Sequence, residues 1–201
     1  MPSPAFERFR FSFFADPNSA RDGLDTRSLA ELEGEERARA EDMLIHYLPD
    51  TRGVIGLGVL RSRRAELLLV PLFEEERREK GSDPTYLARA LWRIRPDPRW
   101  RSALIEVLSS AEFHIHRMHA AIALRDVHDP AVVPPLTAAL DDPEPLVRCY
   151  AAYALLILHD VPFDALKPPE MLYRAMADDP ARRAGGKSDV LAAIAGQEIA
   201  P

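Results

Sequence analysis

Cysteine is almost absent from this chain, because its 201 residues include only Cys149. A single cysteine excludes an intramolecular disulfide and a zinc site built from several cysteines. Cys149 falls within a strongly apolar helical pattern, where a free cysteine behaves as a small hydrophobic residue. We therefore expect a buried, unreactive thiol.

Long apolar runs and glycine-rich loops are also missing. The longest apolar run covers residues 151–158 and is far shorter than the roughly 20 residues that a bilayer-crossing helix needs. Arg8, Arg10 and Asp16 interrupt the N-terminal apolar residues, unlike the continuous apolar region of a secretory signal. The chain has no glycine-rich phosphate loop and no G-x-S-x-G nucleophile motif. We expect a cytoplasmic, non-catalytic protein with no cofactor, no metal and no membrane partner.

Positive charge is scarce as well. The formal net charge is −6, and residues 112–166 contain eight acidic residues and only three arginines. A protein that grips phosphate backbones needs a basic stripe. The charge therefore argues against a nucleic-acid partner and favours a basic protein partner.

A small residue followed by leucine recurs along the chain. The four leucines are 34, 33 and 31 residues apart, in the pairs Gly56-Leu57, Ala90-Leu91, Ala123-Leu124 and Ala154-Leu155. A period in this range is typical of stacked helical hairpins, each of which buries its apolar face against its neighbours. The sequence predicts an all-α, right-handed α-solenoid of about four hairpins.

Capping residues and prolines divide the repeats into helices. Side chains able to cap helix N-termini stand at Asp50, Ser62, Asp83 and Asp129, and Gly34 separates a short turn from the helix before Pro49. We expect the helical hairpins 51–60 with 62–73, 85–94 with 98–108, and 115–127 with 131–140. A fourth hairpin opens at Asp142-Pro143.

The two ends of the chain differ from the repeats. Five of the eight phenylalanines lie in residues 1–28, where residues 8–13 alternate polar and apolar, which is typical of extended backbone. We expect an extended aromatic arm that caps the first repeat or pairs with another chain. Residues 29–177 form the repeat domain. Residues 178–201 contain an exposed loop at 182–187 and a last helix, 189–195, capped by Ser188.

Residues 129–155, DPAVVPPLTAALDDPEPLVRCYAAYAL, are similar to HEAT-like repeats of the phycobilin-lyase type. The likeness is specific over residues 112–160 and looser over residues 29–111. This likeness implies a HEAT-like fold and a protein-binding function. By its size and free-standing repeats, the chain also resembles small bacterial HEAT-like immunity proteins that bind polymorphic toxins. The HEAT-like fold occurs in DNA glycosylases too, but the acidic charge disfavours a nucleic-acid enzyme.

We interpret the chain as a protein-binding module, and most concretely as an immunity protein that occludes a cognate basic toxin. A general scaffold, or a chaperone-like adaptor, is the alternative. Acidic residues near hairpin corners would either cap helices or form one acidic edge that steers the partner. They are Asp126, Asp129, Asp141, Asp142, Glu144 and Asp160.

Three further side chains are candidate anchors for the partner, since interface energy concentrates in tryptophan and arginine. They are Trp92, Arg99 and Trp100. The histidine cluster His114, His116 and His119 lacks the spacing of the H-E-x-x-H metal motif. We place these histidines at the exposed start of a hairpin.

Overall fold

The computed structural model describes residues 1–15, 23–164, 167–197 and 199. Within these residues the secondary structure is entirely helical, which confirms the all-α class. None of the described helices has the length and apolar character needed to cross a membrane. The chain divides into two compact units, Met1–Asp97 and Pro98–Pro201, and each is described by itself.

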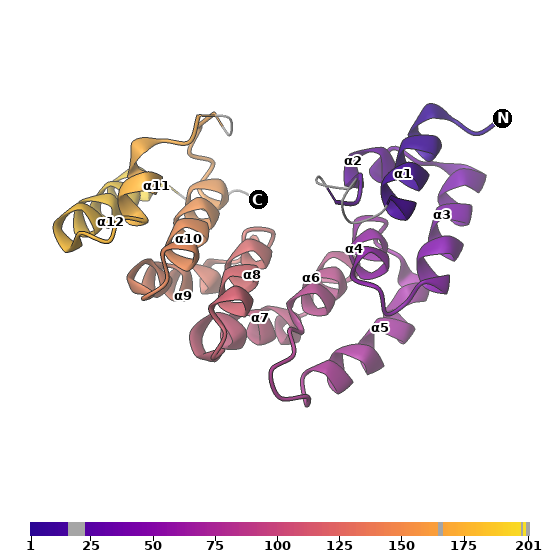
Figure 1. Cartoon of the computed structure of the whole chain (residues 1–201), viewed down its shortest axis with the longest axis horizontal. Coiled ribbons are helices and arrows are strands. Elements are labelled where there is room, and N and C mark those ends of the chain that lie inside the picture. The colour runs from indigo at the N-terminus through magenta and orange to yellow at the C-terminus, as the bar shows by residue number, and fades with distance from the viewer. Residues whose placement is uncertain (16–22, 165–166, 198, 200–201) are drawn as a thin grey trace. The chain divides into compact units, whose positions relative to one another are not determined.

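The first unit is built around α4. This helix packs against α2, α3 and α6, and α5 packs against α6 (Figure 1). The helices of the unit are α1 (Pro4–Phe14), α2 (Thr26–Ala30), α3 (Gly34–His46), α4 (Thr51–Val59), α5 (Arg63–Glu76) and α6 (Thr85–Ile94).

The predicted helix starts of this unit are confirmed. The Asp50 side chain accepts a hydrogen bond from the backbone N–H of Arg52 at 2.8 Å, and Ser62 accepts one from Ala65 at 3.1 Å. Asp83 accepts from the N–H of Thr85 at 3.1 Å. Each bond satisfies a donor that the first turn of a helix leaves without an intrahelical partner.

The N-terminal segment is a helix, so the extended backbone predicted there is wrong for Pro4–Phe14. Phe6, Phe9 and Phe13 recur at the helical spacing i, i+3 and i+7, and all three are buried. This buried stripe outweighs the polar–apolar alternation of residues 8–13. The side chain of Ser3 caps the helix by accepting from the N–H of Phe6. Residues 16–22 of the predicted arm lie outside the described residues.

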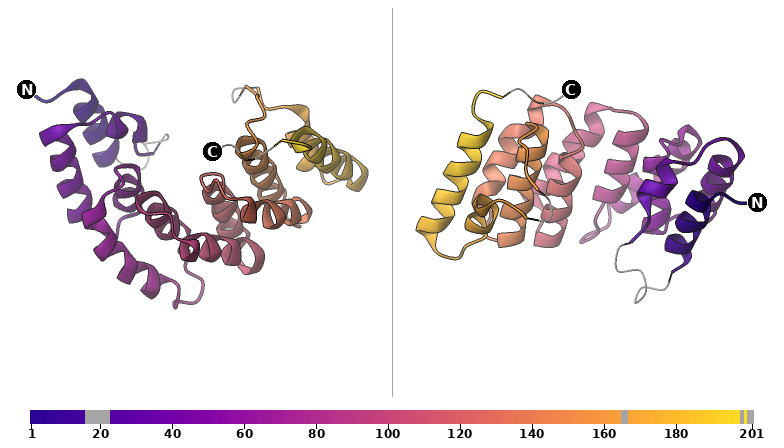
Figure 2. Two further views of the ribbon diagram at one scale, coloured as in Figure 1. Left: turned by 180° about the vertical axis from the view of Figure 1, so that it is seen from behind. Right: turned by 90° about the horizontal axis from the view of Figure 1, so that it is seen from above.

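The second unit has two layers of helices. In one layer α10 packs against both α8 and α12, and the partners α7, α9 and α11 pack against these three helices (Figure 2). The helices are α7 (Pro98–Ser110), α8 (His114–Leu124), α9 (Val133–Ala138), α10 (Pro145–Leu158), α11 (Glu170–Ala175) and α12 (Pro180–Ile194), with short 3-10 helices η1 (Pro130–Val132) and η2 (Ala139–Asp141) beside α9.

The observed helix pairs are shifted by one helix along the chain from the predicted hairpins. Each even-numbered helix packs on the helix before it, as α6 does on α5, α8 on α7 and α10 on α9. The predicted pair 85–94 with 98–108 is divided between the two units. Proline-containing corners occur within the observed pairs, as at Pro84, and also between them, as at Pro96, so proline positions alone did not reveal which neighbours pair.

The C-terminal prediction needs a correction. Residues 182–187 belong to α12, which begins at Pro180 after its N-cap Asp179, so neither the loop nor the Ser188 cap is present. Glycine is required here because α12 approaches α11 closely. A Cβ at Gly186 would lie 2.5 Å from the backbone nitrogen of Ala175. Gly186 therefore reflects helix packing rather than a loop.

Candidate functional site

One accessible face of α10 is uncharged. From Val147 to Leu158 only Cys149, Tyr150, Tyr153 and Ile157 are partly accessible, and the other residues are buried. With Leu146 at the start of the helix, these residues stand at i, i+3, i+4, i+7 and i+11, on one side of the helix. The stripe contains only aliphatic, tyrosine and cysteine side chains. Cys149 is half-buried here rather than fully buried, and burial raises the pKa of its thiol.

α8 carries a matching stripe 31 residues earlier. Ile115, Met118, His119 and Ile122 occupy the positions of Leu146, Cys149, Tyr150 and Tyr153, and all four are at least partly accessible. Because α8 and α10 pack side by side in one layer, the two stripes form one surface. We call it the α8–α10 face. Its members are Ile115, Met118, His119, Ile122, Leu146, Cys149, Tyr150, Tyr153 and Ile157.

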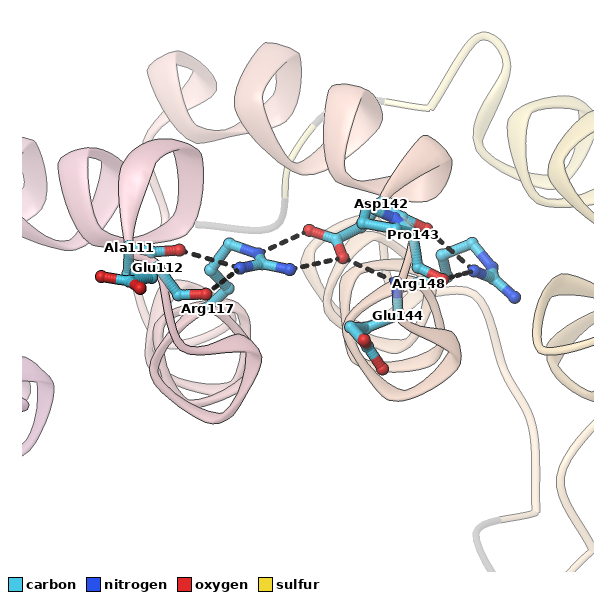
Figure 3. A network of polar contacts seen from close by, with 7 residues as sticks. All are labelled: Ala111, Glu112, Arg117, Asp142, Pro143, Glu144 and Arg148. Atoms are coloured by element: carbon cyan, nitrogen blue, oxygen red, sulfur yellow. Dashed lines mark hydrogen bonds and ion pairs between the residues drawn. The ribbon is translucent and has the colours of Figure 1, made fainter.

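Arg117 fixes the start of α8 to the start of α10 (Figure 3). Its guanidinium donates to both carboxylate oxygens of Asp142, at 2.7 and 3.0 Å. It also donates to the carbonyl oxygens of Ala111 and Glu112, at 2.8 and 3.1 Å. A bidentate arginine–carboxylate pair is strongly directional, so it holds the two helices in a defined register.

Arg148 does the same for the next pair of helices. It stands 31 residues after Arg117, again as the fourth residue of its helix, and is 1% exposed. Its guanidinium donates to five carbonyl oxygens, at 2.8 Å for three of them and 3.3 Å for two. The acceptors are the carbonyls of Asp142, Pro143, Ala175, Met176 and Ala177. Arg148 therefore ties the start of α10 to the end of α11.

These contacts shift the pKa values of the groups involved. Burial alone raises the pKa of the Asp142 carboxyl, but hydrogen bonds from Arg117 and the N–H of Glu144, with the charge of Arg117, lower it below its ordinary value. The hydrogen bond to Asp142 raises the pKa of Arg117. Burial lowers the pKa of Arg148. Asp142 is thus held as a carboxylate between two cationic side chains.

A family model for HEAT repeats matches residues 83–184. The chain belongs to the HEAT-repeat family. The match covers just over half of the sequence, including the α8–α10 face and both arginines, and it confirms the predicted HEAT-like α-solenoid class. HEAT repeats suggest a protein-interaction scaffold. A search of the curated proteins finds no match to this chain.

Within these HEAT repeats, four of the six predicted partner-binding acids already have cationic neighbours. The ion pairs are Asp126 with Arg125, Asp129 with Arg101, Asp141 with Lys187, and Asp142 with Arg117. Asp129 also caps η1 by accepting from the N–H of Ala131 at 2.9 Å, as predicted. Asp142 accepts from the N–H of Glu144, which itself occupies the N-cap position of α10. Four of the six acids thus contact charged groups of the protein itself.

The same acids do not form one edge. Asp141, Asp142 and Glu144 precede α10, whereas Asp160 follows its C-terminal end. A helix of 14 residues is about 21 Å long, so Asp160 belongs to the opposite edge of the layer. Asp126 and Asp129 likewise follow the end of α8. The prediction of a single acidic edge is therefore wrong, because it assumed that every corner lies on the same side.

The predicted anchors occupy different environments. Trp100 is 0% exposed and belongs to the core of α7, so it is not available to a partner, and its prediction as an anchor is wrong. Arg99 is exposed, and its guanidinium lies 3.8 Å from the centre of the Trp100 ring. Trp92 is half-buried on α6 in the first unit. Sequence pattern does not distinguish an apolar anchor from a core residue when both sit at helical spacing.

The three histidines lie on the first half of α8, which is the second helix of its pair and not the start of a hairpin as predicted. His114 is exposed, His116 forms an edge-on ring contact with Phe113, and His119 belongs to the α8–α10 face. Among the described residues, no three histidine, cysteine or carboxylate side chains are grouped as metal ligands would be.

Sequence reasoning missed the α8–α10 face. Its signal was present in the spacing of 31 residues between Ala123-Leu124 and Ala154-Leu155, which also relates the two stripes. The nearly continuous apolar pattern of α10 is typical of a helix wedged between layers. The structure buries most of this helix and leaves one stripe partly accessible, where the Tyr153 ring contacts Phe163 with 5.2 Å between ring centres.

Proposed function

We propose that this HEAT-repeat protein is a non-catalytic protein-binding module and that its partner docks on the α8–α10 face. The observation that carries the proposal is that this face has no Asp, Glu, Lys or Arg side chain on either of two neighbouring helices and carries two tyrosines on α10. The centres of protein interfaces are depleted in charge and enriched in aromatic residues and methionine. Tyr150, Tyr153 and Met118 fit that composition.

The layer is also well suited to present a fixed surface. Arg117 bonds to the Asp142 carboxylate before α10, and Arg148 bonds to backbone carbonyls at the end of α11, which limits sliding between repeats. Preorganised surfaces lose less conformational entropy when they bind. Tyrosine adds contact area at a small entropic cost, because it has only two side-chain torsions to restrict.

The sharper form of the proposal is an immunity protein that occludes the active site of a cognate bacterial toxin. One feature supports it: the net charge of −6, which favours encounter with a basic toxin domain. Since most of the acids are paired within the protein, attraction would come from the net charge rather than from one acidic edge. A general scaffold or chaperone-like adaptor would use the same face.

The binding proposal is tested by affinity purification from cells that encode the protein. The wild-type chain is compared with the Tyr150→Ala/Tyr153→Ala variant. We expect the variant to lose a discrete partner at least about tenfold, because truncating interface tyrosines commonly costs more than 1 kcal/mol each.

Tyr173→Ala is the matched control, since Tyr173 lies on α11 and is 54% exposed. It should recover the partner as the wild type does. If the double variant recovers the partner as well as the wild type does and has the same thermal stability, the partner does not dock on the α8–α10 face.

The immunity proposal has a separate test, which is growth rescue on co-expression with an adjacent toxin gene. Wild type and Tyr173→Ala should restore growth, and Tyr150→Ala/Tyr153→Ala should not. Failure of the wild type to rescue would end the immunity proposal and leave the binding proposal intact.

A further inference from the structure

The outer face of α5 exposes apolar side chains in the middle of a helix. Leu67 is 81% exposed and Leu68 is 44% exposed, and Pro71 is also exposed. The opposite face of the helix, with Ala65, Leu69 and Phe73, is buried. α5 is thus amphipathic in the usual sense and carries a second apolar strip that faces solvent.

Charged residues of opposite sign stand at the two ends of this strip. At 100° per residue, Arg63 and Arg64 at the start and Glu74 and Glu75 at the end fall on the same side as the exposed leucines. The side chain of Arg63 is 70% exposed, and its nearest carboxylate oxygen, on Glu66, is 3.9 Å away. We call this surface the α5 ridge. Its members are Arg63, Arg64, Leu67, Leu68, Pro71, Glu74 and Glu75.

This arrangement is self-complementary under a two-fold axis. When two copies of α5 cross antiparallel at the level of residue 69, Leu67 of one copy faces Pro71 of the other. The same operation brings Arg63 opposite Glu75 in both halves of the contact. Arg64 comes opposite Glu74, although its guanidinium also pairs with Asp42 and Glu41 of α3, at 2.9 and 3.3 Å. Two-fold interfaces need such a patch, because the same surface contributes both sides.

We propose that the α5 ridge is the contact surface for a second copy of this chain, forming an antiparallel homodimer. A partner of a different sequence would have to reproduce both the apolar centre and the reversed charges, which this chain already supplies. A single pair of short helices buries less than the roughly 1,600 Å² of a standard interface. The dimer is therefore weak and depends on protein concentration.

Sedimentation equilibrium of the full chain tests the proposal. Between about 1 µM and 1 mM the wild type should change from monomer to dimer, as a contact of this size predicts. Leu67→Glu should remain monomeric over the same range, because it places like charges at the centre. Leu146→Glu, on the α8–α10 face, should dimerise like the wild type. A wild type that is monomeric throughout, or a dimer broken by Leu146→Glu and not by Leu67→Glu, overturns the proposal.

Charge reversal distinguishes the antiparallel arrangement from other contacts through α5. Arg63→Glu and Glu75→Arg should each weaken self-association at least about tenfold, since like charges then meet twice in the dimer. An equimolar mixture of the two variants should restore a mixed dimer, because both contacts become attractive again. Failure of the mixture to associate, when the wild type does, contradicts the antiparallel geometry.

Discussion

Arg148 is a buried cation whose bonding partners are all backbone carbonyl groups in the described structure. Replacing it by methionine keeps the apolar stem and leaves these carbonyls without their donor. Buried acceptors that lose a partner cost about 1–3 kcal/mol each, so we expect Arg148→Met to lower the free energy of unfolding by about 3 kcal/mol or more. Urea denaturation followed by circular dichroism measures the change.

Arg183 provides the control, because it is the fourth residue of α12 as Arg148 is of α10. Its charge lowers the pKa of Arg148 rather than supporting it. Arg183→Ala should change the stability by less than about 0.5 kcal/mol. Equal losses in the two variants would mean that the carbonyl contacts of Arg148 contribute little.

Asp142 makes the stability of the folded protein depend on pH. Its pKa is lowered in the folded protein, so its contribution to stability is complete above the unfolded value of 3.8 and is lost as the pH falls through the lower folded value. The stability difference between wild type and Asp142→Asn should therefore be largest near neutral pH and shrink below about pH 4. Denaturation curves between pH 2.5 and 7 should show this, and a constant difference across that range would contradict the pairing with Arg117.

At the residue scale, helix caps were predictable from the sequence, but the burial of side chains and their long-range hydrogen bonds were not. Caps such as Asp50, Ser62 and Asp129 follow from residue type and position alone. The burial of Trp100 and the bonds of Arg148 depend on helices more than 20 residues away or on helix orientation. An arginine in an apolar helix gives no local sign that distant carbonyls will receive its hydrogen bonds.

At the scale of elements, close helix contacts depend on glycine. A Cβ at Gly186 would lie 2.5 Å from the nitrogen of Ala175 and 2.7 Å from the carbonyl carbon of Arg174, both backbone atoms of α11. Gly186→Val should separate α12 from α11 and lower the free energy of unfolding by about 2 kcal/mol. Thermal unfolding measures the effect.

Gly185 is the matched control one position earlier. A Cβ there would meet the guanidinium end of Arg174, which can rotate away. Gly185→Ala also improves helix propensity by up to about 1 kcal/mol, so it should be neutral or mildly stabilising. Similar losses at both glycines would show that the close approach is not the cause.

Element types were predictable where one periodicity dominated. The helical stripe of α6 and the separation of α2 from α3 at Gly34 follow the sequence pattern. Residues 8–13 satisfied a strand-like alternation locally, and only the wider spacing of Phe6, Phe9 and Phe13 identifies the helix. The pairing of helices could not be predicted, because similar proline-rich corners occur within and between hairpins.

At the scale of the whole molecule, the acidic charge predicts no strong binding to phosphate backbones. The net charge is −6, and several arginines are already engaged by carboxylates or carbonyls. Fluorescence anisotropy should detect no binding of a short DNA duplex at about 0.1 M salt up to about 10 µM protein. Salt-sensitive binding below that concentration would revive a DNA-glycosylase-like activity.

The all-α solenoid class was accessible from the repeat period, since stacked hairpins impose it on the sequence. The family was accessible from the resemblance of residues 129–155 to HEAT-like repeats. The α8–α10 face was not predictable from the sequence, because it forms only when two stripes from separate repeats come together in one layer. The charge of the chain suggested an acidic edge, whereas the structure pairs most of those acids and divides them between two edges.

Site-specific photo-crosslinking in the native cells tests directly whether a partner docks on the α8–α10 face. A photoreactive phenylalanine analogue is placed at Tyr150 on the α8–α10 face, or at the exposed Ser102 on α7 in the other layer. We expect irradiation to link position 150, and not position 102, to one discrete protein. Equal labelling at the two positions, or a partner linked only through position 102, would contradict binding through this face.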